Sequence, residues 1–390
     1  MLRALEADRA HIADIDAQIR VLEGSISVLR AQKALVQERL DSYTYPVLIL
    51  PNEITSEIFI HFLPPYPDCP PLTGLFSPNL LTSICRTWRE IAIDLPVLWR
   101  AICFDDVSVQ LPYFELHIHI IDTWLRRSRS CPLSFEINNG DLEIYSPSTL
   151  AAIHNYRSRL EYLVLHLHHS HIPTIEGPMS LLRHLDLQFD ESPPKDLLLY
   201  LKAPLLRTAI LDDAAALHVI LPWAQLTELT LSPVFPHECV SILRQTSTLV
   251  QCELHLACCG YARLPEVQLP RLESLILQEV DDEPIEGYFE TFTVPALRSL
   301  HVPENFLERD PIGALSSFIS KSGCKLEHLC VTGPISIIKD LKDYRCGFPF
   351  ITKLSFDGWG VFSEDEDEDG MIMHDVDELY AHLFDSFTFN

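Results

Sequence analysis

A six-residue pattern of apolar residues recurs nine times from residue 160 onward, and it constrains the fold more than any other feature. Each copy places apolar residues at its first, fourth and sixth positions, as in LEYLVL at Leu160 and LESLIL at Leu272. The copies begin at Leu160, Leu182, Leu206, Leu226, Leu249, Leu272, Leu297, Leu326 and Ile351, in steps of 20 to 29 residues. Residues that alternate along a strand point to opposite faces, so one copy cannot cover its own apolar side chains. The pattern therefore predicts short strands that stack on their neighbours.

The period and the apolar positions resemble those of the leucine-rich-repeat family, in which about 20 to 29 residues separate successive copies. The resemblance implies an α/β solenoid over residues 161–362. The family usually has Asn or Cys eight residues after the start of a copy, where the side chain bonds to the turn backbone. Of the nine such positions in this chain only Asn305 fits. We therefore expect an irregular leucine-rich-repeat solenoid whose convex side is closed by helices or irregular loops, with a non-solenoid α/β arrangement as the alternative.

The residues between the leucines are predicted to line the concave face of such a solenoid. They are polar, largely acidic and rich in histidine, which suits a basic peptide or a client protein that presents lysine. The candidate client-binding residues are Tyr162, Asp186, Asp212, Glu228, Glu253, His255, His301 and Asp357. A sheet face that is merely solvated is the alternative, and these residues do not identify a client.

A second feature, residues 50–102, predicts three short helices. The first begins in LPNEITSEIF, where Pro51 suits the first helical position and Ile54, Ile58 and Phe62 form an apolar stripe. The second is expected in NLLTSICRTWREIAID, where Asn79 is the predicted N-cap. One face of this helix is apolar and is formed by Leu80, Leu81, Ile84, Trp88 and Ile91. Such a small module has a thin core and gains stability by burying its remaining apolar surface on another protein.

LPNEITSEIF, ICRTWREIA and LPVLWRAI together resemble an F-box, the adaptor-docking module of cullin-type ubiquitin ligases, in the form common among fungal F-box proteins. The resemblance implies that residues 46–105 dock a Skp-type adaptor and, through it, a cullin. The matching residues, which face the adaptor or brace the helices that do, are Leu50, Pro51, Ile54, Ile58, Ile84, Cys85, Trp88 and Trp99. The segment 64–78 is longer than a compact F-box needs, so the second helix is expected away from its usual position. A small helical domain without an adaptor is the alternative.

Residues 1–45 are predicted to form one long helix that ends before Pro46. With Leu5 at heptad position a, the a positions hold Leu5, Ile12, Ile19, Ile26, Lys33 and Leu40, and the d positions hold Asp8, Ile15, Leu22, Leu29, Val36 and Tyr43. Mostly Ile at a and Leu at d favours a parallel two-stranded coiled coil, although Gly24 lowers helix propensity locally. We expect a homodimer through residues 2–43, with a helix that folds back on its own chain as the alternative.

The remaining segments are expected to join and to cap these parts. Residues 106–160 contain a predicted helix in LHIHIIDTWLRRS and a predicted strand at 133–137, and they have no Gly- or Ser-rich linker. We expect this segment to cap the first repeat and to join it rigidly to the F-box. Residues 363–390 combine the run EDEDED, predicted to be a solvated loop or an interaction tail, with apolar residues at helical spacing that predict a capping helix.

The sequence contains no motif that predicts catalysis or cofactor binding. It lacks the G-x-S-x-G, G-x-x-x-x-G-K-[ST] and H-E-x-x-H patterns and any pair of C-x-x-C. His166, His168, His169 and His171 lie close together, but no carboxylate or thiol accompanies them at a recognised metal-binding spacing. We expect them to be surface residues, and we expect no metal, no cofactor and no enzymatic activity.

Composition restricts the class of partner and the compartment. Asp and Glu number 55 against 29 Lys and Arg, a net charge of −26 that repels nucleic acid and anionic membranes. No N-terminal signal peptide and no apolar run long enough to span a bilayer is evident. Eleven irregularly spaced cysteines then indicate reduced thiols and a cytoplasmic or nuclear protein.

These features predict a substrate-recognition subunit of a Skp–cullin–F-box ubiquitin ligase. It would dock the adaptor through the F-box and an unidentified client protein through the repeats. The alternative is a protein-interaction scaffold that uses the coiled coil and the repeats without assembling a ligase.

Overall fold

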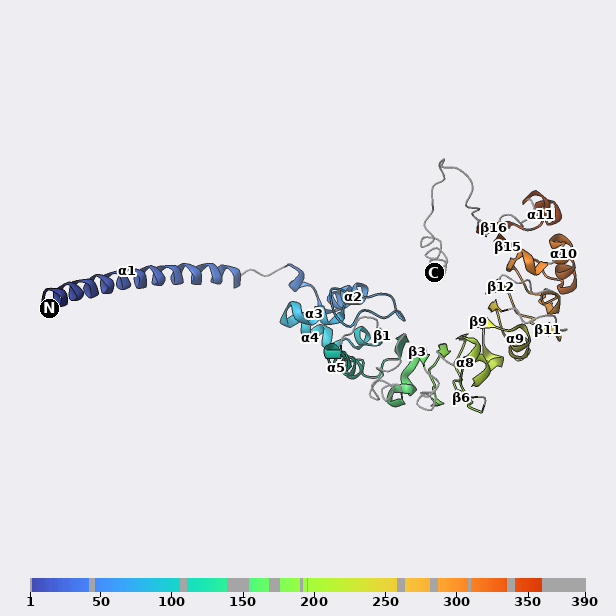
Figure 1. Ribbon diagram of the computed structural model, residues 1–390, viewed down its shortest axis with the longest axis horizontal. Helices are drawn as coiled ribbons and strands as arrows, with labels where there is room; N and C mark the ends of the chain where they lie inside the picture. Colours follow the sequence, from blue (N-terminus) through green and yellow to red (C-terminus); the bar gives the residue numbers. More distant parts are fainter. Residues whose placement is uncertain are drawn as a thin grey trace. The chain divides into compact units, whose positions relative to one another are not determined.

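The computed structural model is a mixed α/β protein with a long N-terminal helix and parallel β-sheet (Figure 1). It describes residues 2–41, 46–105, 111–138, 154–167, 176–189, 192–194, 196–257, 264–280, 287–307, 310–334 and 341–359. The chain divides into two compact units, the first comprising Met1–Leu206 with His218–Pro222 and the second Arg207–Leu217 with Trp223–Asn390. Each unit is described by itself.

The first unit opens with α1, a helix that covers Leu2–Asp41 without interruption (Figure 1). Every side chain described in α1 is exposed, including the apolar ones at heptad positions a and d. Gly24 lies in the middle of the helix, and a Cβ added at this position would meet no other atom within 4 Å, so packing does not require glycine here. The helix therefore forms as the heptad pattern predicts, but no packing within the described chain explains its apolar residues.

The helical module, residues 46–100, follows α1. It comprises η1 (Pro46–Ile49), α2 (Asn52–Phe62), α3 (Pro78–Ile84), α4 (Arg86–Asp94) and η2 (Pro96–Trp99). The elements α2, α3, α4 and η2 contact one another, and they lie together beside α5 (Leu111–Arg127) in Figure 1. The expected helix in LHIHIIDTWLRRS is therefore present as part of α5.

Three expectations about the helix ends in the module were wrong. Pro51 is the N-cap of α2 and not its first helical residue, because its backbone is extended and its carbonyl accepts the first helical bond, from Thr55 N at 3.0 Å. Ser77, and not Asn79, caps α3, because Pro78 occupies the first helical position and Ser77 Oγ accepts from Asn79 N at 3.2 Å.

The third correction concerns the single helix expected over NLLTSICRTWREIAID. The chain is extended at Cys85, where φ is −152° and ψ is 171°, so two helices form in place of one. Cys85 is the N-cap of α4, since its Sγ accepts from Trp88 N at 3.4 Å. Leu80, Leu81 and Ile84 therefore belong to α3, Trp88 and Ile91 belong to α4, and the five residues do not form one continuous face.

The helical module continues directly into the sheet of the first unit. After Trp99 the chain forms β1 (Ala101–Asp105), which pairs in parallel with β2 (Leu133–Asn138). These residues were expected to belong to the F-box, and the strand was not predicted. The sheet has the order β1-β2-β3-β5, with β3 at Leu160–Leu167 and β5 at His184–Phe189. One buried row of its core, set by the strand register, is Ile102, Phe135, Leu163 and Leu185.

The second unit has a seven-stranded parallel sheet in which the strand order follows the chain. Its strands are β7 (Thr208–Leu211), β9 (Glu228–Val234), β10 (Gln251–Leu256), β12 (Ser274–Glu279), β14 (Ser299–Pro303), β15 (His328–Pro334) and β16 (Lys353–Trp359). The helices α9 (Pro236–Leu243), α10 (Pro311–Ser322) and α11 (Leu341–Gly347) lie on one side of this sheet (Figure 1). The buried row at its centre is Ala209, Leu229, Cys252, Leu275, Leu300 and Leu329.

All nine copies of the apolar pattern coincide with strands of the two sheets. From Leu182 onward each strand begins two residues after its copy does. Buried and less buried residues alternate along β5, β7 and β10. Short strands opposite the main sheets were not predicted: β4 (Gly177–Pro178), β6 (Leu199–Lys202) and β8 (Val219–Ile220) in the first unit, and β11 (Val267–Gln268) and β13 (Phe292–Thr293) in the second. His168, His169, His171, the EDEDED run and the expected C-terminal helix lie outside the described residues.

Candidate protein-docking site

An apolar stripe runs along the exposed side of α2. Ile54 and Ile58 have 49% and 44% of their side-chain surface exposed, and Phe62 follows one turn later. Phe62 stacks on Phe76 with ring centroids 6.4 Å apart, and Phe76 is itself 64% exposed. Residues four apart on a helix lie above one another, so these four side chains form a continuous row, which we call the α2 stripe.

The side of α2 that carries Thr55 and Phe59, which flanks the stripe, packs on the core of the module and holds the stripe in place. Phe59 is fully buried, and its ring meets that of Trp88 edge to face at 5.0 Å. Trp99 is also fully buried, and its Nε1 donates to the carbonyl oxygen of Ala92 at 2.8 Å. Ile54 and Ile58 therefore do not contribute to the buried core of the module, which is formed by other side chains such as Phe59 and Trp99.

The eight residues predicted to dock the adaptor divide into three groups. Pro51, Ile54, Ile58 and Ile84 are exposed, and Leu50, Cys85 and Trp88 are half-buried. Trp99 is wholly inaccessible, so it braces the module and does not belong to a docking surface. Leu75 and Phe76 are 75% and 64% exposed and were not predicted to join this surface, because no local pattern places the loop 64–77 beside α2.

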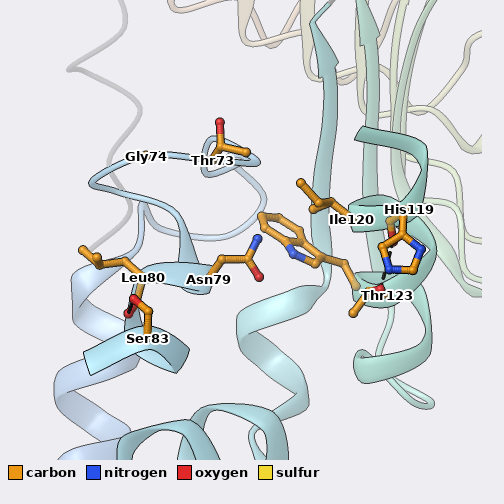
Figure 2. Close-up of a pocket in the computed structure, with 9 residues that line it drawn as sticks. Thr73, Gly74, Asn79, Leu80, Ser83, His119, Ile120 and Thr123 are labelled. Atoms are coloured by element: carbon orange, nitrogen blue, oxygen red, sulfur yellow. Dashed lines mark hydrogen bonds between the residues drawn. The ribbon is translucent and has the colours of Figure 1, made fainter. Parts of the chain in front are cut away.

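A groove of about 520 Å³ separates α3 from α5 (Figure 2). Its residues are Thr73, Gly74, Asn79, Leu80, Ser83, His119, Ile120, Thr123 and Trp124. Figure 2 shows Leu80 and Ser83 on the α3 wall, His119 and Ile120 on the α5 wall, and Asn79 pointing from α3 toward α5. The Asn79 side chain also donates from Nδ2 to the carbonyl of Leu72 at 3.0 Å, which ties the loop to the start of α3.

The loop that lengthens the module packs on the sheet of the first unit. Tyr66 donates from its hydroxyl to Glu161 at 3.1 Å, and its ring meets that of Tyr162 at 5.4 Å. The guanidinium of Arg100 lies 3.7 Å from the centroid of the Tyr66 ring. Burial, together with the Glu161 carboxylate, raises the pKa of Tyr66 well above its usual value. The additional residues therefore attach the module to β3.

This contact changes the role of one candidate client-binding residue. Tyr162 lies between Tyr66 and His184, whose rings are 5.4 and 5.9 Å from its own, so part of its surface is covered by the module. Asp186 lies on the less buried face of β5, and Gln188 Nε2 donates to its carboxylate at 3.3 Å. Burial raises the pKa of Asp186 and lowers that of His184.

Of the candidate client-binding residues in the second unit, Glu228, Glu253, His255 and His301 lie on the less buried face of the sheet. Glu253 Oε1 is 2.9 Å from His255 Nε2, and Gln278 Nε2 donates to the same oxygen at 3.5 Å. Thr208 Oγ1 donates to Glu228 at 2.9 Å. The register places Ile210, Thr230, Glu253, Ile276 and His301 in one lateral row across five strands. Asp212 follows β7, and Asp357 pairs with Thr332 in the register of β15 and β16.

No model of a known protein family matches the chain, and no curated protein and no solved structure matches it significantly. In the part of the chain that the structure describes, no three or more His, Cys, Asp or Glu side chains gather as they would to hold a metal ion. None of the described helices combines the length and the apolar character needed to cross a membrane.

Proposed function

We propose that the chain is the client-recognition subunit of a Skp–cullin–F-box ubiquitin ligase and performs no chemistry itself. The helical module docks the adaptor, and the sheets bind the client. The observation that carries the proposal is the α2 stripe, an exposed apolar row on a module whose own core is complete. A receptor of this kind acts by raising the local concentration of a client lysine near the ubiquitin-charged enzyme.

The size of the hydrophobic effect makes the stripe a credible docking surface. Fully burying an Ile side chain gives about 1.5–3 kcal/mol, so covering the exposed half of Ile54 or Ile58 gives about 1 kcal/mol each. Phe76 adds a large aromatic side chain, a residue type that is enriched at protein–protein interfaces. Because the platform beneath is folded, this gain is not offset by ordering the module on binding.

The repeat region is proposed to be an irregular leucine-rich-repeat solenoid. Three observations support this: consecutive copies supply neighbouring parallel strands, the leucines of adjacent strands stack in register, and helices cover one side of the sheet of the second unit. The opposite face is then the binding face. Its acidic residues, among them Glu228 and Glu253, favour a client segment that carries Lys or Arg.

The test uses two aspartate substitutions on the α2 stripe. The full chain carrying Ile54→Asp and Ile58→Asp should lose binding to a purified Skp-type adaptor in a pull-down, while its thermal unfolding stays close to that of the wild type. Ile60→Asp is the matched control, since Ile60 is 38% exposed on the other side of the same helix and should leave binding intact. Full retention of adaptor binding by the double variant would overturn the docking surface. A wild-type chain that binds no adaptor would favour the scaffold.

A further inference from the structure

The apolar seam of α1 has no covering surface in the described chain. Its exposed residues are Leu5, Ile12, Ile15, Ile19, Leu22, Ile26, Leu29, Val36 and Leu40, each at least 42% exposed. An isolated helix in water derives little stability from propensity alone, and every side chain described in α1 is exposed, so burial within the described chain adds little to it. The heptad spacing of the seam is that of a two-stranded coiled coil, so the partner it fits is a second copy of the same helix.

Two charged residues of opposite sign interrupt this seam. Asp8 occupies a d position near one end and Lys33 an a position near the other, and both are exposed without a partner among the described residues. In a parallel, in-register pair each residue faces its own copy, so Asp8 meets the partner's Asp8 and Lys33 meets the partner's Lys33. Both layers then hold like charges in the least hydrated part of the interface, which is unfavourable.

We infer that α1 pairs with a second copy of itself in the antiparallel orientation. Antiparallel pairing brings a positions opposite d positions, and one register aligns five a positions with five d positions. Its layers are Leu5 with the partner's Val36, Ile12 with the partner's Leu29, Ile19 with the partner's Leu22, Ile26 with the partner's Ile15, and Lys33 with the partner's Asp8. Both charged residues thereby meet an opposite charge, and every other layer is apolar on both sides.

Two effects oppose this arrangement, and both are weaker. The preference of Ile at a and Leu at d for parallel pairs is a matter of side-chain packing, and it tolerates a single polar a residue but not two like-charged layers. Along the edge of the antiparallel pair, Arg9 approaches the partner's Arg30 and Asp16 approaches the partner's Glu23. These positions are fully solvated, where charge interactions are small and screened by salt.

Disulfide trapping in the full chain distinguishes the two orientations. The chain has no cysteine before Cys69, so the wild-type chain measures any cross-linking that does not involve α1. In the inferred register Ile12 lies beside the partner's Leu29 and about 25 Å from the partner's Ile12, from a rise of 1.5 Å for each residue. Mixed Ile12→Cys and Leu29→Cys chains should therefore cross-link to each other. Cross-linking of Ile12→Cys chains alone, as efficient as in the mixture, would overturn the inference.

Charge exchange provides an independent test in the wild-type cysteine background. Asp8→Lys alone and Lys33→Asp alone should each weaken the dimer by about tenfold or more, since each change creates two like-charged layers. The double variant Asp8→Lys with Lys33→Asp should restore wild-type affinity, because the layers are again opposite in sign. Sedimentation that gives equal affinities for all four chains, or a monomeric wild type at micromolar concentration, would overturn the inference. Neither substitution touches the α2 stripe, so adaptor binding is tested separately.

Discussion

Two parts of the first unit, α1 and the helical module, both expose large apolar side chains, but among the described residues only the module also has buried ones. In the module, Phe59 and Trp99 are fully buried beneath exposed residues such as Ile54. In α1 no described residue is buried at all. The module therefore displays apolar surface as a folded body, whereas α1 displays it as a helix that lacks a core.

The difference indicates two kinds of binding. A surface on a folded domain does not have to fold when it binds, so its affinity is not reduced by a folding cost. A helix without a core becomes stable only when its partner covers it, so its folding and its association are one event. The predictions that follow measure the two parts separately.

The largest effect is expected where the module depends on its core. Trp99→Ala should lower the free energy of unfolding by about 3–5 kcal/mol, because it removes a buried indole, its bond to the carbonyl of Ala92 and its contact with Trp124. Urea unfolding followed by circular dichroism measures this change. Ile84→Ala is the control, since Ile84 is 53% exposed and its truncation should stay within about 0.5 kcal/mol. A loss below 1 kcal/mol for Trp99→Ala would contradict the conclusion that the helical module, unlike α1, is stabilised by a buried core.

A smaller effect is expected in the hydrogen exchange of α1. Below the dissociation constant of the pair, amides of α1 should exchange about a hundredfold faster than those of α3 and α4, since no buried residue protects them. Raising the protein concentration should slow exchange in α1 and leave the module unchanged. Mass spectrometry of peptides from both parts provides the measurement. Strong protection of α1 that does not depend on concentration would mean that the helix folds back on its own chain.

The smallest effect is expected at the contact between the module and β3. Tyr66→Phe removes the hydrogen bond to Glu161 and should lower the free energy of unfolding by about 1 kcal/mol. Tyr200→Phe is the control, because Tyr200 is 50% exposed. The effect also has a pH signature: the folded chain holds the Tyr66 proton above the usual pKa of 10.0, so stability falls as pH rises past that value. That fall should be shallower in Tyr66→Phe, and identical curves would contradict the role given to the bond.

The strands of both sheets were predictable because their signal is local and repeated. Leu185, Leu229 and Leu275 fall at equivalent positions of their copies and fill the same layer of their sheets. β1 was missed because its first residues, Ala101 and Ile102, fall at the end of residues 50–102, where a third short helix was expected. One short apolar run does not distinguish a strand from a helix. The break at Cys85 was missed for a similar reason, since cysteine is a weak signal for a helix cap.

The candidate site was predictable in its residues but not in its surroundings. Ile54 and Ile58 were selected from their spacing and lie on the surface as a docking row requires. Tyr66 could not have been placed, because its partner Glu161 is 95 residues away in the sequence. Trp99 was assigned to the docking residues because a motif records which residues recur and does not separate those that bind from those that support the fold.

The strand β1 has a consequence for how such proteins diversify. Residues 101–105 follow the helical module without a break, yet their hydrogen bonds belong to the sheet through β2. A recombination event that exchanged residues 46–105 between two related genes would therefore replace the outermost strand of the recipient's sheet as well as its module. The incoming Ile102, which is buried, would have to match the resident Phe135. The helical module and the sheet of the first unit are thus coupled through the packing of Ile102 on Phe135. Hybrids that fold should arise mainly between genes that encode compatible side chains at these two positions.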